Sequence, residues 1–250
     1  MTSDDPDLCS FPFAGAHFSV VGQTALWWPQ ARALLVADLH FEKASWFAVR
    51  GQMLPPYDSM ATLERLAGLA RTLDAAHIYC LGDNFHDDGG VERLPEAARA
   101  MLHELADRHG LHWIVGNHDP GLGARVPGPV SEELRIGDLL LRHEAGAFAQ
   151  GGEVSGHYHP KARIRAAGRI IARPCFVRGQ WCDSNGLSCG RLILPAFGAL
   201  TGGLDVTSDA IAALFPRGYQ ALVPTRDKLV TFPFSVAESE EKAQLSLWQK

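Results

Sequence analysis

The chain has 250 residues, a hydrophobic content of 46% and a formal net charge of −5. This length is long for one domain but within the range of two-layered sheet folds, and the hydrophobic content supports a sizeable core. The negative charge disfavours binding of nucleic acid through the global field of the protein, so any such binding needs a local basic surface.

Hydrophobic periodicity predicts alternating strands and helices in the first half of the chain. The expected elements are, in order, strands near residues 17–28 and 34–37, a helix over about 59–73, a strand ending at Leu81 and a helix over about 96–109. In the first helix Leu63, Leu66 and Ala70 fall on one face, so that face is expected to pack on a sheet. Pro95 suits the first turn of the second helix.

From Gly168 onward the pattern changes to short strands and glycine-rich turns. Two strands are expected over residues 191–195 and 227–232, and one short helix near residues 209–214. We interpret this part as the second sheet of one sandwich, so residues 1–250 are predicted to form a single domain. Residues 238–250 are charged and polar, and they are expected to be a frayed tail or, alternatively, a partner contact.

Five short motifs rich in metal-binding side chains each follow an apolar, strand-length run. They are Asp38-Leu39-His40, Gly82-Asp83-Asn84-Phe85-His86, Gly116-Asn117-His118-Asp119, Arg142-His143-Glu144 and Gly156-His157-Tyr158-His159. Strands that end on one edge of a sheet bring the residues after them together, so we expect these motifs to meet. Carboxylate, amide and imidazole ligands without cysteine suit Mn, Fe, Zn or Ni. A closed zinc site fits poorly, because such sites use four ligands, mostly cysteine, at close spacing.

These motifs closely resemble the signature of the calcineurin-like metallophosphoesterase superfamily over the segment from Asp38 to His159. The resemblance implies an α/β fold, a four-layer αββα sandwich in which helices flank two mixed β-sheets. It also implies a ligand set for each of two divalent metal ions, with one carboxylate bridging both. The implied ligands are Asp38, His40 and His159 for one ion, Asn117, His143 and His157 for the other, and Asp83 as the bridge.

The chemistry implied by this resemblance is phosphoester hydrolysis. Two ions about 3.5 to 4 Å apart clamp the attacking and leaving oxygens, and a bridging hydroxide attacks phosphorus in line. His118 would be the catalytic histidine that stabilises or protonates the leaving oxygen. His86 stands where many phosphatases of the superfamily have Asp, and it resembles the nuclease branch, in which this histidine contacts the catalytic one. The alternative role for His86 is a hydrogen bond to a loop backbone.

A closer resemblance, to the bacterial DNA-ligase-associated metallophosphoesterases, covers nearly the whole chain. The segments that carry it are residues 36–44, 50–58, 159–162 and 194–204. It implies a manganese-dependent DNA endonuclease that works in repair beside a DNA ligase, a helicase and an exonuclease. An open two-metal cleft suits flexible single-stranded DNA better than a duplex. The alternatives are a small-molecule phosphodiesterase or pyrophosphatase acting on nucleotides or lipid precursors, and a non-catalytic scaffold, which would normally have lost ligands.

A basic stretch follows the last motif, with no acidic residue between positions 161 and 178. Its members are Lys161, Arg163, Arg165, Arg169, Arg173 and Arg178. On an alternating strand Lys161, Arg163 and Arg165 share one face, so these residues and Lys43 are predicted to contact DNA phosphates. The alternative is an ordinary solvated strand face. Phe41 and Tyr158 either stack on bases or wedge the loops.

The remaining signals concern location. No apolar run reaches the roughly 20 residues of a membrane span. The first eight residues are acidic, so neither secretion nor membrane insertion is expected, and a cytoplasmic protein is predicted. Five cysteines, an odd number, favour a reducing compartment. Cys175, Cys182 and Cys189 recur every seven residues, which matches no metal-ligand spacing.

Overall fold

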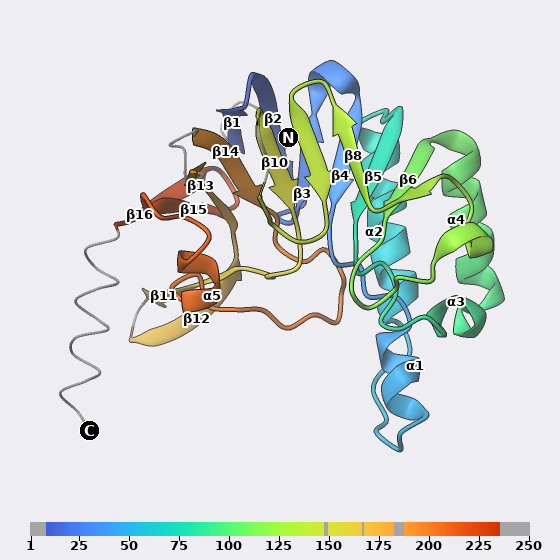
Figure 1. Ribbon diagram of the computed structural model, residues 1–250. Coiled ribbons are helices and arrows are strands. Elements are labelled where there is room, and N and C mark those ends of the chain that lie inside the picture. Colours follow the sequence, from blue (N-terminus) through green and yellow to red (C-terminus); the bar gives the residue numbers. More distant parts are fainter. Residues whose placement is uncertain (1–8, 148–149, 167, 183–187, 236–250) are drawn as a thin grey trace.

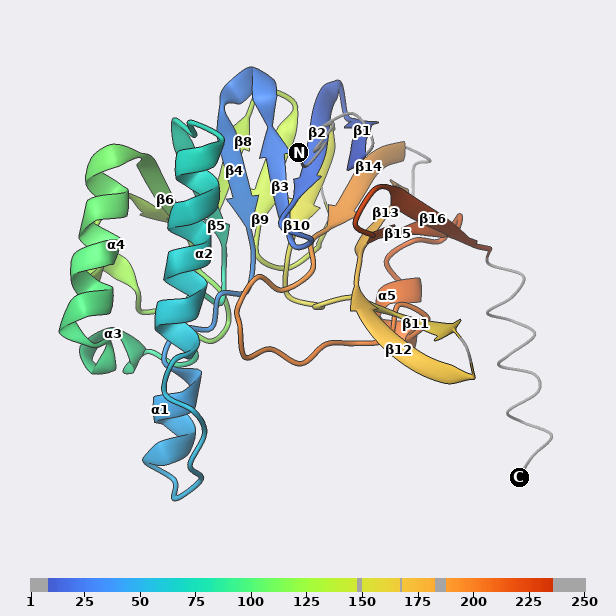
Figure 2. The ribbon, with the colours of Figure 1, turned by 180° about the vertical axis from the view of Figure 1, so that it is seen from behind.

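The computed structural model describes residues 9–147, 150–166, 168–182 and 188–235 of the chain. Two seven-stranded sheets pack face to face, and helices cover the outer face of the first sheet (Figures 1 and 2). Each sheet contains parallel and antiparallel pairs, so both sheets are mixed. The predicted sandwich of two mixed sheets is therefore confirmed.

The first sheet has its strands in chain order. They are β1 (Ser10–Phe13), β2 (Ala16–Val21), β3 (Ala25–Trp28), β4 (Ala33–Val36), β5 (His77–Leu81), β6 (Gly110–Ile114) and β7 (Val130–Ser131). Strands β1 to β4 pair antiparallel, and β4 to β7 pair parallel. The run expected as strand near residues 17–28 is divided into β2 and β3, because Gly22 and Gln23 adopt left-handed backbone and reverse the chain.

The second sheet has the order β16-β15-β13-β14-β10-β9-β8. Its strands are β8 (Glu133–Ile136), β9 (Leu139–Arg142), β10 (Gly152–Ser155), β13 (Phe176–Cys182), β14 (Ser188–Ile193), β15 (Tyr219–Pro224) and β16 (Leu229–Phe234). Strands β9, β10 and β14 are parallel to one another. Strands β11 (Lys161–Ala166) and β12 (Arg169–Pro174) form a separate antiparallel hairpin.

Two of the helices that cover the first sheet, Asp58–Thr72 and Glu96–Arg108, were predicted nearly to the residue, whereas Lys43–Ala48 and Gly90–Arg93 were not predicted. The helices are α1 (Lys43–Ala48), α2 (Asp58–Thr72), α3 (Gly90–Arg93), α4 (Glu96–Arg108) and α5 (Asp209–Ala212), with 3-10 turns η2 (Pro29–Ala31) and η3 (Gly123–Arg125). Leu63 and Leu66 of α2 are fully buried and pack in one cluster with Val36 of β4, as the spacing of the apolar residues predicts. None of the helices in the described ranges is long and apolar enough to cross a membrane.

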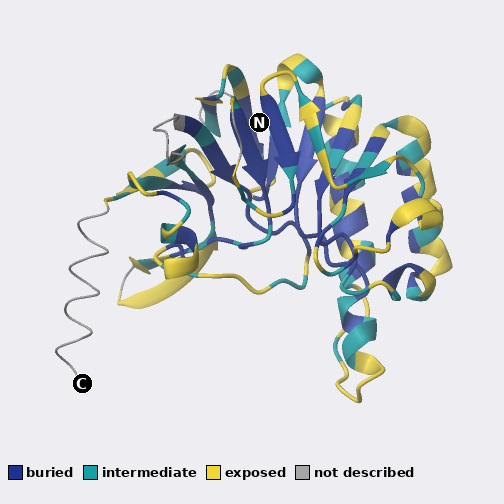
Figure 3. Cartoon of the chain, viewed as in Figure 1, coloured by how far each residue is buried: buried dark blue, intermediate teal, exposed yellow. Residues whose placement is uncertain are grey.

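The core forms on both faces of the first sheet, because its central strands are apolar throughout. Leu34 and Val36 of β4 point toward the helices, and Leu35 points toward the second sheet. Figure 3 shows this buried interior between the layers. On the outer face of the second sheet, the one helix in the described residues is the single turn α5, whose Ile211 is fully buried.

A buried ion pair ties the second sheet to the loop after β9. Arg191 of β14 is 1% exposed and donates to the carboxylate of Glu153, which is fully buried in β10. Arg191 also donates to the carbonyl of Gly146, and the backbone N–H of Gly146 donates to Glu153 at 2.9 Å. Because each charge has its partners, burial is tolerated, and the loop that begins at His143 is held in place.

Candidate metal centre

The predicted residues meet at one edge of the sandwich, where β4, β5, β6, β9 and β10 end. The loops after β4 and β5 continue side by side beyond their strands. The backbone N–H of Asp38 donates to Gly82 at 3.1 Å, that of His40 donates to Asp83 at 2.9 Å, and that of Phe41 donates to Asn84 at 2.8 Å. This extended pairing of two loops brings the first two motifs together.

One group of ligand atoms combines residues from both sheets. Asp38, His40, Asp83 and His159 place one nitrogen or oxygen atom each within 4.8 Å of one another. The Nε2 atoms of His40 and His159 are 3.3 Å apart, and Nε2 of His159 is 3.3 Å from Oδ1 of Asp38. Nε2 of His40 is 3.8 Å from Oδ2 of Asp83. Such a set of nitrogen and oxygen atoms suits a divalent ion of the first transition row.

A second group lies beside the first. Nε2 of His143 is 3.0 Å from Oδ1 of Asn117 and 3.3 Å from Oδ1 of Asp83. Nδ1 of His157 is 3.0 Å from the same oxygen of Asn117 and 3.1 Å from Nε2 of His143. Nδ1 of His143 donates to the carbonyl of Leu81 at 3.0 Å, which leaves the lone pair of Nε2 directed into the group. A backbone partner on one ring nitrogen is the usual arrangement of metal-binding histidines.

Asp83 belongs to both groups, because its two carboxylate oxygens face different histidines. Oδ2 faces His40, and Oδ1 faces His143. The Asp83 side chain is 4% exposed, so these contacts lie away from bulk water. The seven predicted ligands therefore converge on two adjacent positions that share one carboxylate, and their donor atoms fit two divalent ions.

His118 and His86 lie next to the first group. The rings of His118 and His86 are stacked with their centroids 5.2 Å apart, and the ring of His118 is also 5.2 Å from that of His40. Nδ1 of His118 donates to the backbone carbonyl of His86 at 2.9 Å. Its Nε2 therefore points toward the centre, 3.9 Å from Oδ2 of Asp83. The predicted contact between His86 and His118 is present.

Comparison with known proteins is consistent with this geometry. The profile of the calcineurin-like phosphoesterase family matches residues 31–188, which is more than half of the chain and includes all five motifs. The chain belongs to this family. None of the curated proteins matches it.

Many solved structures are similar to this phosphoesterase. The crystal structure of the nuclease MPE of Pseudomonas putida matches with a TM-score of 0.64 and 27% identity, covering 90% of this chain and 98% of that chain. Yfce, a phosphoesterase from E. coli, matches with a TM-score of 0.42 and 13% identity, covering 82% and 98%. The predicted superfamily is confirmed, and the likeness to a nuclease agrees with the closer resemblance to DNA-ligase-associated metallophosphoesterases.

The backbone at the centre of this phosphoesterase is strained. Five of the seven predicted ligands are non-glycine residues with positive φ, a conformation that costs about 1 to 3 kcal/mol each. They are Asp38 (55°), His40 (47°), Asp83 (46°), His157 (71°) and His159 (44°). Apolar periodicity carries no signal for this strain. It is tolerated because the surrounding packed strands and paired loops fix the backbone around each residue.

Two glycines are required where the ligand loops cross. A Cβ atom on Gly116 would lie 2.2 Å from Oδ1 of Asp83, and one on Gly82 would lie 2.3 Å from Nδ1 of His143. Neither Cβ atom could be accommodated at such a distance without displacing Asp83 or His143, which belong to the metal centre. The glycines of the second and third motifs therefore permit the close approach of the ligand side chains.

Asp119 has a structural role at the centre that sequence reasoning missed, although it closes the third motif. It is fully buried, and Oδ2 accepts hydrogen bonds from the backbone N–H of Asn84 at 2.8 Å and of Phe85 at 3.1 Å. Oδ1 accepts from the backbone N–H of Gly116 at 2.7 Å. Asp119 thus joins the loop that carries Asp83 to the loop that carries His118.

We expect Asp119→Ala to destabilise the fold and to lower metal occupancy, because it leaves several buried donors without an acceptor. The loss of unfolding free energy should be about 2 to 4 kcal/mol, measured by urea denaturation. Asp119→Asn keeps one acceptor oxygen and should lose less. Equal stability of the alanine variant and the wild-type protein would contradict this role.

Burial lowers the pKa of three histidines at the centre, which favours the neutral form that binds metals. Burial, followed by the neighbouring His159, lowers the pKa of His40 to about 2. Burial and then Lys43 lower the pKa of His86 to about 4. The pKa of His157 is lowered by burial and then by His143. The close contact of His40 with Asp83 therefore joins a carboxylate to an uncharged ring, and the lone pair of the ring stays available.

The predicted phosphate-binding residues differ in their surroundings. Lys43 is half-buried beside the centre, and its pKa is lowered by burial, with Asp58 opposing this effect and Lys161 adding to it. Lys161 donates from Nζ to the carbonyl of Thr201 at 3.3 Å. Arg163 forms an ion pair with Asp205, with 3.0 Å between Nε and Oδ2. The two lysines therefore lie near each other, whereas Arg163 is engaged in an ion pair.

The two aromatic residues of the motif loops are buried. Phe41 is 1% exposed and packs on Phe85 with ring centroids 5.4 Å apart, and Tyr158 is 8% exposed. Of the two roles considered for them, wedging of the loops agrees with the structure and base stacking does not. Tyr158 packs on His157 with ring centroids 4.9 Å apart, and Trp46 and Phe47 in α1 lie on the other side of the centre's histidines, with centroids 4.9 and 6.3 Å from that of His86.

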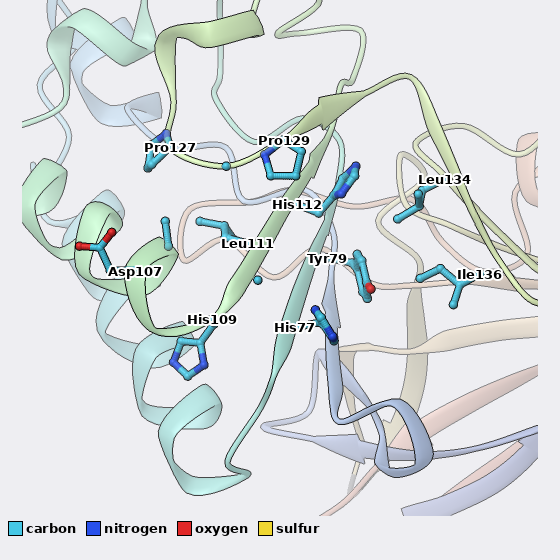
Figure 4. A pocket seen from close by; sticks show the side chains of 13 residues that line it. His77, Tyr79, Asp107, His109, Leu111, His112, Pro127, Pro129, Leu134 and Ile136 are labelled. Atoms are coloured by element: carbon cyan, nitrogen blue, oxygen red, sulfur yellow. The ribbon is translucent and has the colours of Figure 1, made fainter.

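A separate cavity of about 500 Å³ lies at the opposite ends of the strands. It is lined by His77 and Gly110, the first residues of β5 and β6, and by Tyr79, His112 and Leu134 among others (Figure 4). No group of three ligating side chains within coordinating distance was found among its described residues. The candidate centre therefore lies away from this cavity, at the carboxyl ends of the strands.

Proposed function

We propose that this phosphoesterase is a manganese-dependent phosphodiesterase that acts as an endonuclease on single-stranded DNA. The observation that carries the proposal is the pair of ligand groups that share Asp83. The DNA substrate is supported by 27% identity over 90% of the chain to a protein described as a nuclease. It is also supported by the resemblance to DNA-ligase-associated metallophosphoesterases.

The proposal assigns each side chain of the centre a role. Asp38, His40 and His159 would hold one ion, Asn117, His143 and His157 the other, and Asp83 would bridge the two. When bound, two divalent ions supply a nucleophile at neutral pH and stabilise charge on the phosphoryl oxygens. Manganese is the proposed metal, and iron, zinc and nickel also suit these ligands.

His118 would give a proton from Nε2 to the leaving oxygen, which requires the imidazolium form because Nδ1–H already donates to the carbonyl of His86. Its Nδ1 is occupied by the carbonyl of His86, so the orientation of the ring is fixed and Nε2 faces the centre. His86 would be a positioning residue, because its own ring stacks on that of His118. Lys43 and Lys161 would bind phosphates next to the cut through their ammonium groups, and Arg163 would contribute less because it pairs with Asp205.

The proposed setting is DNA repair in the cytoplasm, in functional association with a DNA ligase, a helicase and an exonuclease. This setting comes from the resemblance to the DNA-ligase-associated family. The five cysteines agree with a reducing compartment.

The test of this function is cleavage of circular single-stranded DNA by metal-stripped protein supplied with Mn, Mg, Zn or Ni. An aryl phosphodiester serves as the second substrate, and the Asp83→Ala variant as the control. Manganese-dependent linearisation of the circle, absent in the variant, would support the endonuclease. Hydrolysis of the aryl ester with the circle left intact would instead indicate a small-molecule substrate. A panel of nucleotides and lipid precursors would then be tested as substrates.

We expect Lys161→Ala to weaken binding of single-stranded DNA and to reduce its salt dependence. Loss of one phosphate contact should lower the slope of log Kd against log salt concentration by about 0.7. Arg163→Ala is the matched comparison, since it removes one positive charge two residues away. Its effect should be smaller because Arg163 already pairs with Asp205. Equal slopes for Lys161→Ala and the wild-type protein would refute a phosphate contact.

A further inference from the structure

The β11–β12 hairpin is a basic projection, and the proposed function uses Lys161 and Arg163 at its base but none of its other arginines. It begins two residues after His159 and forms a sheet of its own. The views in Figures 1 and 2 place it on the same side of the sandwich as α1, with the strand ends that carry the centre between them. Figure 3 shows that β12 is largely exposed, whereas at the base of the hairpin Ala162 of β11 is buried and Ile164 packs on the core.

The register of the hairpin places positive charges on both of its faces. Residues that pair across an antiparallel ladder share a face, and neighbours along a strand alternate. Lys161, Arg163 and Arg165 alternate along β11 and therefore share one face, to which Ile170, the pair partner of Arg165, also belongs. Arg173 pairs with Ala162 and Arg169 with Ala166, so these two arginines lie on the other face. The basic stretch predicted as a single track is therefore divided between two faces.

Three arginines of the hairpin have no partner within the part of the chain that the structure describes. Arg165, Arg169 and Arg173 are exposed, and none makes an ion pair or hydrogen bond to another described residue. Near the turn, Ile170 is 63% exposed and Ile171 is 38% exposed, on opposite faces. The hairpin thus combines unpaired guanidinium groups on both sides with apolar side chains close to its tip.

This arrangement fits a groove between two phosphate backbones better than contact with one strand. A hairpin that follows a single backbone needs cations on one face only. The major groove of duplex DNA is about 12 Å wide and admits a two-stranded β-ribbon. Arginines on the two faces then reach phosphates on the two walls.

We propose that the β11–β12 hairpin is a second DNA-binding element that enters the major groove of duplex DNA beside the cut. The inference rests on the proposed DNA substrate and adds a duplex segment to it. The single strand enters the metal centre, and the hairpin holds the adjoining duplex. Arg165, Arg169 and Arg173 determine the affinity for this duplex.

The test compares the full-length wild-type protein with the variant R165A/R169A/R173A. Binding of a short duplex and of a single strand of the same length is measured by fluorescence anisotropy, in chelator to prevent cleavage, over about 50 to 200 mM salt. The variant should bind the duplex about 10- to 100-fold more weakly, with a salt slope lower by about 2 to 3. Its binding of the single strand should stay within about twofold of wild type, because that strand lacks a groove.

The matched control is R71A/R108A/R135A, which removes the same charge from exposed positions on α2, α4 and β8. An equal loss of duplex binding in this control, an unchanged duplex slope, or equal losses on both DNA forms would overturn the proposal. Cleavage of a single-stranded circle by the wild-type protein tests the endonuclease separately. A protein that fails to cut the circle but binds duplex through these arginines would refute the endonuclease and retain the hairpin as a DNA-binding element.

Discussion

Asp83→Ala should abolish phosphodiester hydrolysis, leaving less than a few per cent of the wild-type rate. Asp83 is the residue whose carboxylate faces both ligand groups, with Oδ1 near His143 and Oδ2 near His40. Its removal also leaves the backbone N–H of His118 without the acceptor that it has at 3.0 Å. Both ligand groups and the loop of the proton donor are therefore damaged by one change.

The measurement combines the rate with an aryl phosphodiester, the rate with single-stranded DNA and the metal content per chain. Both rates should fall together, and at least one equivalent of metal should be lost. Asp88→Ala is the matched control, because Asp88 lies on the same loop but is not a predicted ligand, and it should keep the metal content of the wild-type protein. Activity of Asp83→Ala above a few per cent of wild type would contradict the bridging role.

His118→Ala should retain the bound metal and slow DNA cleavage by about 10² to 10⁴. The side chain of His118 is 38% exposed and Nε2 faces the centre, so it is placed to meet the leaving oxygen of a bound phosphodiester. The alkoxide that leaves DNA needs a proton. A 4-nitrophenolate leaving group does not, so the loss should be much smaller for the nitrophenyl ester.

This difference between substrates separates a proton donor from a merely structural residue. A structural defect would lower both rates by the same factor. His103→Ala is the matched control, since His103 is exposed on α4 and should tolerate the change. If His118→Ala lost metal, His118 would be a ligand instead, consistent with the proximity of His40, His86 and His118 to one another.

Local signals explain why the helices and central strands could be predicted. Helix α2 runs over Asp58–Thr72, against an expectation of about residues 59–73, and α4 runs over Glu96–Arg108, against about 96–109. Both helices repeat apolar residues every three or four positions, and this period is a property of the chain itself. The division of residues 17–28 into two strands depended on left-handed backbone at Gly22 and Gln23, for which apolar periodicity has no signal.

The ligand residues were also visible in the sequence, because each follows an apolar strand. Parallel strands deliver the residues after them to a common edge, so the convergence of Asp38, Asp83 and Asn117 on the first sheet follows from strand order alone. His143 and His157 follow strands of the second sheet. Their approach to Asp83 depends on how the two sheets pack, which no local pattern records.

By itself, the sequence determined the helices Asp58–Thr72 and Glu96–Arg108 through their apolar period. The five motifs carried the family resemblance, which implied the fold class and the residue types gathered at the strand ends. Only the tertiary structure decided the left-handed backbone of five ligands, the buried Asp119 that joins two loops and the faces on which the hairpin arginines lie. The physical reason is the separation along the chain of the residues that interact. Apolar period acts between neighbours in the chain, whereas strain, burial and register are set by segments that meet only after folding.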